Sequence, residues 1–135
     1  MTTTNSTTED STATDQDAAT PRDLPASDGL TQFQHDCLFV IAGYERGRYR
    51  DDRVSGRLPH GLAIKDTLQG RYGTEVHHGR LYPNLDTLTN LGLVAKTEKD
   101  RRTNIYGLTD QGWEVLRRRV QWTLGCLDGE TGDDA

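Results

Sequence analysis

Apolar residues recur every three or four positions in two segments of the chain, which is the spacing of an α-helix with one buried face. In residues 30–44 the apolar positions are Leu30, Phe33, Cys37, Val40, Ile41 and Tyr44. They predict a first helix capped by Ser27 or Asp28, with Cys37 as a small core residue. In residues 59–73 the positions are Ile64, Leu68 and Tyr72. They predict a second helix, and Gly73 suits the left-handed conformation that often follows one.

The segment "HHGRLYPNLDTLTNLGLV", residues 77–94, predicts a third helix with one apolar and one polar face. The apolar face carries Leu81, Leu85 and Leu88. The outward positions are Arg80, Tyr82, Pro83, Asp86 and Thr87, and the entry end carries His77, His78 and Asn84. Pro83 lies within the first two turns and crowds only Gly79, so we expect a slight kink there. Gly92 ends the helix.

After this glycine the apolar period changes from that of a helix to that of strands. "LVAKTEKDRRTNIYGLT" predicts a β-hairpin with the tip "KDRRTN". Thr109 or Asp110 then caps a last helix, "DQGWEVLRRRVQWTLGC". Its apolar positions fall at near-heptad spacing and are Trp113, Leu116, Val120, Leu124 and Leu127. An exposed stripe of this kind indicates a homodimer seam, and the alternative is a helix folded back on its own core.

The order helix, helix, helix, hairpin, helix is that of a winged helix-turn-helix, a mainly α fold with a small β-hairpin wing (α+β). In this motif the second helix of the pair enters the major groove of double-stranded DNA. We therefore expect DNA contacts from His77, His78, Arg80, Tyr82, Asn84 and Thr87 on the third helix, and from Lys99, Arg101, Arg102 and Thr103 at the wing. Arginine and asparagine can pair with base edges, and the wing arginines can reach phosphates.

The net charge of −5 is distributed unevenly along the chain. Residues 29–125 hold fifteen basic and eleven acidic side chains, whereas residues 1–28 hold six acids and one arginine. The sequence thus predicts an acidic disordered tail (1–28), a DNA-binding domain (29–108), a C-terminal dimerisation helix (109–127) and a second acidic tail (128–135). The basic central part is the part that can meet an anionic partner.

The segment between the first two helices, residues 45–58, carries five arginines and two glycines. It predicts a loop, with a short strand around residues 49–54. Two roles stay open for Arg46, Arg48, Arg50, Arg53 and Arg57. They could contact the DNA backbone, or they could pair with Glu45, Asp51 and Asp52 beside them.

Three segments, "HGLAIKDTL", "GRLYPNLDTLTNLGLV" and "DRRTNIYGLTDQG", together resemble the PadR-type winged-helix transcriptional regulators over about residues 30–125. "LYPNLDTL" is similar to the recognition-helix signature of that family. The resemblance implies a homodimer that binds a near-palindromic operator, usually as a repressor. Three lysines against thirteen arginines, with acidic ends, favour a salt-adapted protein with salt ions at the DNA interface, and the alternative is an ordinary protein with two acidic tails. The same features make the chain similar to the haloarchaeal branch of the family, and that resemblance implies a role in the oxidative-stress response. The arginine-rich insert is longer than in most members.

Other classes of function have weaker support in the sequence. No nucleophile, phosphate-loop or carboxylate-pair motif of an enzyme is present, and adjacent histidines rarely share one metal ion. We expect no cofactor, no membrane span and a cytoplasmic protein. Two alternatives are a winged-helix module that binds another protein and a small-molecule sensor of the same fold. If the protein senses oxidants directly, Cys126 is the expected redox thiol.

Overall fold

The computed structural model describes residues 28–53 and 56–128. Its elements are α1 (Gln32–Glu45), α2 (Gly61–Tyr72), α3 (His78–Asn90), β1 (Val94–Asp100), β2 (Thr103–Leu108) and α4 (Asp110–Asp128). The predicted mainly α fold with a two-stranded wing is confirmed, and its element order is that of a winged helix-turn-helix. Apart from Asp28 and Asp128, the two predicted acidic tails lie outside the described residues.

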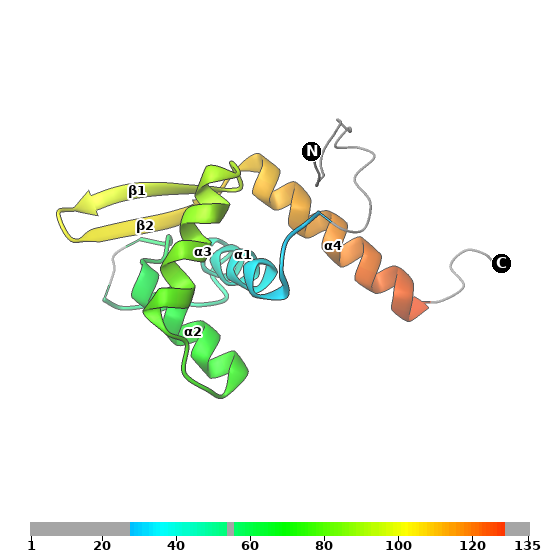
Figure 1. The fold of residues 1–135 in the computed structure, drawn as a ribbon, viewed down its shortest axis with the longest axis horizontal. Helices are drawn as coiled ribbons and strands as arrows, with labels where there is room; N and C mark the ends of the chain where they lie inside the picture. The colour runs from blue at the N-terminus through cyan, green and yellow to red at the C-terminus, as the bar shows by residue number, and fades with distance from the viewer. Residues whose placement is uncertain (1–27, 54–55, 129–135) are drawn as a thin grey trace, which may run out of the picture.

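The central helix, α1, contacts α2, α3, α4 and β2, so the other elements are arranged around it (Figure 1). Its N-cap is Thr31, whose hydroxyl accepts from the Gln34 N–H at 3.1 Å while the Gln34 side chain accepts from the Thr31 N–H at 3.0 Å. This reciprocal cap satisfies two backbone donors at once. The predicted Asp28 cap is wrong, because its carboxylate contacts His35 Nε2 at 2.9 Å, and Ser27 lies outside the described residues.

The helix pair α2 and α3 follows the apolar pattern of the sequence. Gly73 follows α2 with a φ of +73°, which confirms the left-handed C-cap. The α3 leucines, Leu81, Leu85 and Leu88, are fully buried. Pro83 lies inside α3, which runs as one helix from His78 to Asn90. The two helices therefore present the predicted apolar faces to a common core.

The hairpin pairs β1 with β2 in antiparallel register from Val94 opposite Leu108 to Glu98 opposite Asn104. Val94 and Tyr106 are buried at its base, and β1 beyond Val94 is exposed, so the wing projects from the core (Figure 1). The short strand predicted around residues 49–54 is wrong for its described part, since residues 49–53 contain no strand.

The first turn of α4 is seated tightly against the loop that joins α3 to β1. Thr109 caps the helix by accepting from the Gly112 N–H at 3.0 Å, as one of the two predicted caps. The Thr109 hydroxyl also donates to the Gly92 carbonyl at 2.6 Å, and its N–H donates to the Leu93 carbonyl at 3.1 Å. A side chain at Gly112 would collide with that Leu93 carbonyl. The start of α4 therefore has a fixed direction relative to α3 and the wing.

Candidate nucleic-acid interface

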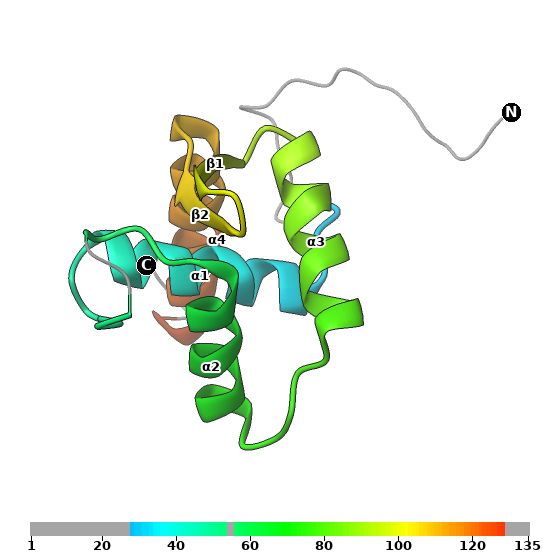
Figure 2. The ribbon, with the colours of Figure 1, turned by 90° about the vertical axis from the view of Figure 1, so that its left-hand side faces the viewer.

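Helix α3 and the β1–β2 hairpin both lie toward the viewer in Figure 2. His77, His78, Arg80 and Thr87 are exposed, as a DNA-reading helix requires. The remaining α3 residues expected to bind DNA, Tyr82 and Asn84, are half-buried. Helix and wing thus form one surface, on which the predicted side chains are not equally accessible.

Arg80 lies on the ring of Phe33 from α1, with its guanidinium carbon 4.0 Å from the ring centroid. Phe33 is only 5 % exposed, so the arginine covers the outer face of this core residue. A cation–π contact at the surface is worth about 0.5–1 kcal/mol, less than the roughly 1–3 kcal/mol of a bidentate contact with a base. The stacked position can therefore hold Arg80 in place without preventing it from reaching a guanine.

Asn84 is engaged at both ends of its amide. Its Oδ1 accepts from Gln34 Nε2 at 2.9 Å, and its Nδ2 donates to the Arg80 carbonyl at 2.7 Å. The first bond ties α3 to α1 across fifty positions of sequence, which no local pattern could reveal. To read a base, this amide would first have to give up bonds that hold the helix pair together.

Tyr82 covers the start of α2. Its ring stacks on His78 with centroids 5.7 Å apart, and a Cβ at Gly61 would collide with the Tyr82 hydroxyl. Burial raises the pKa of this phenol. Gly61 therefore has a role that the sequence did not indicate, which is to make room for an α3 side chain.

The wing tip presents exposed basic side chains in a tight turn. Lys99, Arg101 and Arg102 are exposed, and Thr103 is half-buried. The Asp100 carboxylate accepts from the Arg102 N–H at 2.9 Å, and this bond is the main cause that lowers the Asp100 pKa. Behind the tip, Lys96 Nζ lies 3.3 Å from Asp86 and links the wing to α3. The tip thus has a defined shape and carries both signs of charge.

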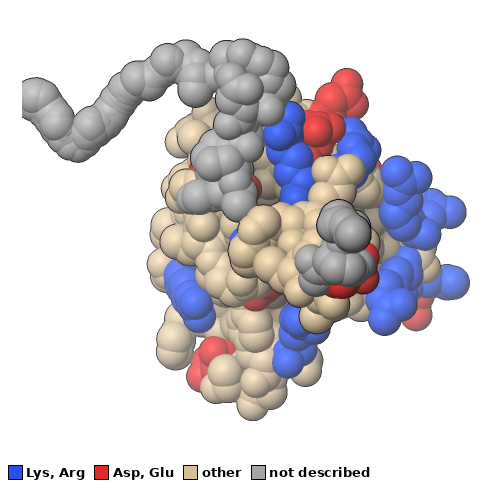
Figure 3. Space-filling model, turned by 90° about the vertical axis from the view of Figure 1, so that its right-hand side faces the viewer, with Lys and Arg blue, Asp and Glu red and all other residues tan. Residues whose placement is uncertain are grey.

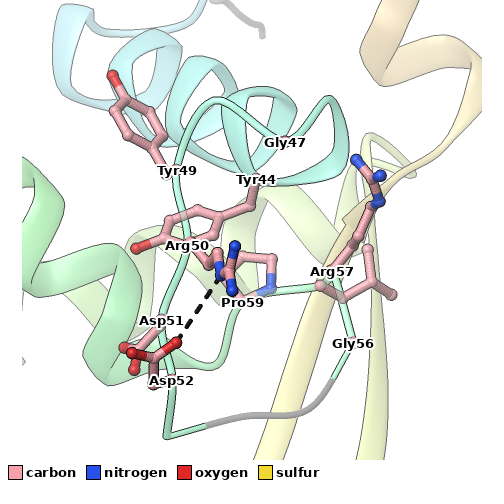
Figure 4. A pocket seen from close by; sticks show the side chains of 10 residues that line it. Tyr44, Gly47, Tyr49, Arg50, Asp51, Asp52, Gly56, Arg57 and Pro59 are labelled. Atoms are coloured by element: carbon pink, nitrogen blue, oxygen red, sulfur yellow. Dashed lines mark ion pairs between the residues drawn. The ribbon is translucent and has the colours of Figure 1, made fainter.

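The arginines of the insert make contacts within the protein. Arg53 pairs with Asp51 and with Asp66 of α2 at 2.7 Å, and its hydrogen bond lowers the Asp51 pKa to about 2. Arg46 lies over the Trp113 ring at 4.5 Å. Figure 4 shows Arg50, 3.8 Å from Asp52, and Arg57, which donates to the Glu45 carbonyl at 3.3 Å. Of the two open roles, these contacts favour internal pairing.

Glu45 itself has a different partner from the one considered in the sequence. Its carboxylate accepts from the Leu108 N–H at 2.5 Å, where β2 leaves the sheet. The contact joins the C-terminal end of α1 to the base of the wing, where β2 ends. A half-buried acid at this position is therefore a structural tie rather than a counterion for the insert.

The apolar stripe of α4 divides into two parts. Leu116 is 4 % exposed and packs on the core, and Trp113 is half-buried beneath Arg46. Farther along the helix lie four exposed apolar residues, here named the α4 apolar surface: Val120, Trp122, Leu124 and Leu127. This part of α4 extends past the rest of the fold (Figure 1). The first half of the helix thus folds back on its own core, and the homodimer seam stays a prediction for the exposed second half.

Figure 3 views the molecule from the side toward which α4 projects, where uncharged atoms predominate at the centre and basic side chains gather toward one edge. Cys126 is exposed near this end of α4, whereas Cys37 is buried, as predicted, and burial raises its pKa to about 12. The redox role of Cys126 stays a prediction. Within residues 28–53 and 56–128, no group of three or more His, Cys, Asp or Glu side chains could hold a metal ion.

In the part of the chain that the structure describes, every helix is too short or too polar to span a membrane.

The sequence model of the transcriptional regulator PadR-like family matches residues 54–118. No curated protein gives a significant match.

Two solved structures of RosR from Halobacterium salinarum are similar to this chain. In a complex designated RosR-S1, identity is 44 %, with a TM-score of 0.62 and coverage of 75 % of this chain and 79 % of RosR. In RosR crystals grown from NaBr, identity is 42 %, with a TM-score of 0.61 and coverage of 79 % and 83 %. A MarR variant from E. coli in complex with operator DNA shares the fold at 22 % identity, with a TM-score of 0.53 and coverage of 74 % and 60 %. With this identity to RosR, the family match and the winged helix, the chain belongs to the PadR-like family of transcriptional regulators.

Proposed function

We propose that this DNA-binding regulator represses transcription by binding a near-palindromic operator as a homodimer. The observation that carries the proposal is the division of the surface. Helix α3 and the wing, which carry the exposed polar residues, share one side, and the end of α4 that carries the α4 apolar surface projects on another (Figures 1 and 2). One chain therefore has separate surfaces for DNA and for a second copy. Repression is supported by the family resemblance alone.

On the DNA side, α3 lies in the major groove and the wing lies along the backbone. Arg80 reads a base edge from its position on Phe33, and His77, His78 and Thr87 are further exposed positions of this helix and of its N-cap. Arg101 and Arg102 contact phosphates, together with Lys99 and Thr103. In this arrangement the helix supplies sequence preference and the wing supplies affinity.

On the other side, the α4 apolar surface meets the same surface of a second copy. Val120, Trp122, Leu124 and Leu127 are between 42 % and 79 % exposed, which is costly for a helix that remains in water. A two-fold seam buries them and repeats the DNA face, so that two recognition helices meet two half-sites. This is the geometry that a near-palindromic operator requires.

The direct test is binding to a duplex selected by the protein from a random pool. We expect two chains per duplex by analytical ultracentrifugation and two protected half-sites, one or more helical turns apart, in a hydroxyl-radical footprint. One chain on a single protected site would contradict the homodimer. A selection that enriches no sequence would favour the module that binds another protein.

We also propose that the protein binds DNA in concentrated salt, because its composition resembles haloarchaeal proteins and RosR of H. salinarum is similar to it. Exposed acids lie beside the wing and α3: Asp100 is held charged by its hydrogen bonds, and Asp86 contacts Lys96. Near phosphates, such carboxylates take up cations on binding, which offsets the cations released by the arginines.

The expected result is a shallow or positive dependence of operator affinity on potassium chloride, with binding that persists above roughly 1 M, where the screening length is only about 3 Å. The measurement is an anisotropy titration across salt, on protein whose circular dichroism shows it folded at each concentration. A steep fall of operator affinity, with binding lost by a few tenths molar potassium chloride, would contradict this proposal. The acidic composition would then be a property of the tails and not of the DNA interface.

A further inference from the structure

A hollow of about 360 Å³ lies between the start of α2, α3 and the wing, where β2 and the turn before it face α2. Its lining residues are His60, Gly61, Leu62, Tyr82, Arg102, Thr103, Asn104 and Tyr106. None of them is acidic, in a chain where acids outnumber basic residues. Three elements thus converge on one small space with an arginine, a histidine, hydroxyls and an amide. This set of groups favours an anion.

His60 is fixed in this hollow by two independent contacts. Its Nδ1 accepts from the Ala63 N–H at 3.1 Å and so caps α2. Its backbone forms an isolated bridge with Ile105, and the neighbouring Pro59 carbonyl accepts from the Tyr106 N–H at 2.9 Å. Strand β2 and helix α2 together therefore determine where the imidazole lies.

The cap also determines the tautomer of this histidine. A ring nitrogen that accepts a hydrogen bond carries no proton, so the neutral ring must carry its proton on Nε2. Since Nδ1 is already used by the helix, Nε2–H is the group left for a ligand. The backbone donor of Ala63 is likewise occupied, so the free end of α2 alone is not what makes the site.

We infer that His60 is a positioning residue for the operator backbone, and that its Nε2–H donates to one phosphate seated in this hollow. This inference rests on the proposed function, because it adds a contact to the same interface. The Tyr82 hydroxyl and the Arg102 guanidinium supply further donors from α3 and the wing. One phosphate is thereby bound jointly by both elements that meet DNA, which fixes the depth of α3 in the groove.

The test uses His60→Ser, because serine keeps a side-chain acceptor for the cap but lacks the ring donor. We expect the variant to unfold at the temperature of the wild type and to bind the selected operator at least tenfold more weakly, as for a hydrogen bond to a charged group. The loss should leave the salt slope unchanged, because a neutral donor releases no counterion. Arg102→Ala should instead reduce that slope by about one.

A set of duplexes with one neutral methylphosphonate at a time identifies the phosphate. At one position in each half-site, the difference between wild type and His60→Ser should disappear. Tyr82→Phe, which removes only a hydroxyl, should weaken binding to the unmodified operator. Its affinity should equal that of the wild type on the duplex whose methylphosphonate is at the same position. The matched control is His77→Ser, a histidine at the start of α3 that lies outside the hollow and should show no coupling there.

Equal operator affinity of wild type and a folded His60→Ser would overturn the inference and leave the proposed function intact. The same holds if the loss persists on every methylphosphonate duplex. Failure of the wild type to bind any selected duplex would overturn the proposed function, and the phosphate site with it.

Discussion

A Val120→Asp variant is expected to be a folded monomer, whereas a Leu116→Asp variant is expected to have no folded domain. The two positions lie one helical turn apart on α4, but Leu116 is 4 % exposed and Val120 is 42 % exposed. An unpaired carboxylate at Leu116 would be buried in the core, at a cost of roughly 3–5 kcal/mol. Small domains have only about 5–15 kcal/mol of stability. At Val120 the carboxylate stays hydrated in the single chain and becomes buried only at a seam.

Light scattering and circular dichroism separate these outcomes. Val120→Asp should halve the mass, keep the helical spectrum and lose operator binding, because one recognition helix reaches only one half-site. Gln121→Asp is the matched control, since it adds the same charge at an exposed polar position beside Val120. A Val120→Asp protein that remains a dimer would move the seam away from the α4 apolar surface.

Loss of Arg80 and loss of the wing arginines should weaken DNA binding in different ways. Arg80→Ala should cost about 1–3 kcal/mol on the selected operator and relax the preference at one base pair in each half-site. The paired change of Arg101→Ala with Arg102→Ala should weaken all duplexes together and reduce the salt slope by about two, because phosphate contacts carry no sequence information.

The measurement is a set of binding curves on the operator, on single-base variants of it and on unrelated duplexes. Arg117→Ala is the matched control: this arginine is exposed on α4, 3.3 Å from Glu114, and should not affect binding. If Arg80→Ala lowers the melting temperature but leaves base preference unchanged, the contact with Phe33 is the whole role of Arg80. Selective loss at one base in the wing variant would contradict a backbone role for the wing.

The fold was predictable because its main signals are local in sequence. The leucines of α3, the glycine that ends α2 and the change of period after Gly92 each report on a few neighbouring residues. The Thr31 cap was missed although its partner Gln34 lies three residues away, because the acid at Asp28 is an equally good cap by residue type.

The finer features of the site depend on contacts between distant residues. Asn84 has the residue type of a base reader, but its bond to Gln34 exists only because α1 and α3 cross. Likewise, the apolar stripe of α4 is buried only as far as the core extends. Leu116 and Val120 belong to the same near-heptad pattern in the sequence, so the pattern alone does not show that one is buried and the other exposed. The place of His60 was missed because the hollow that it lines is formed by segments far apart in the chain, with residues from α2, α3 and β2.

The firm seating of the first turn of α4 makes this helix a lever. Because Thr109 and Gly112 hold its start against the Gly92–Leu93 loop, α4 cannot swivel without carrying the recognition helix and the wing with it. Nineteen residues give it a length of roughly 28 Å. In a dimer joined near the far end, a tilt of about 10° at the seam would shift each recognition helix by roughly 3–5 Å, on the order of the 3.4 Å rise of one base pair. Any signal that alters the angle of the seam would therefore be transmitted as a change of register on the operator.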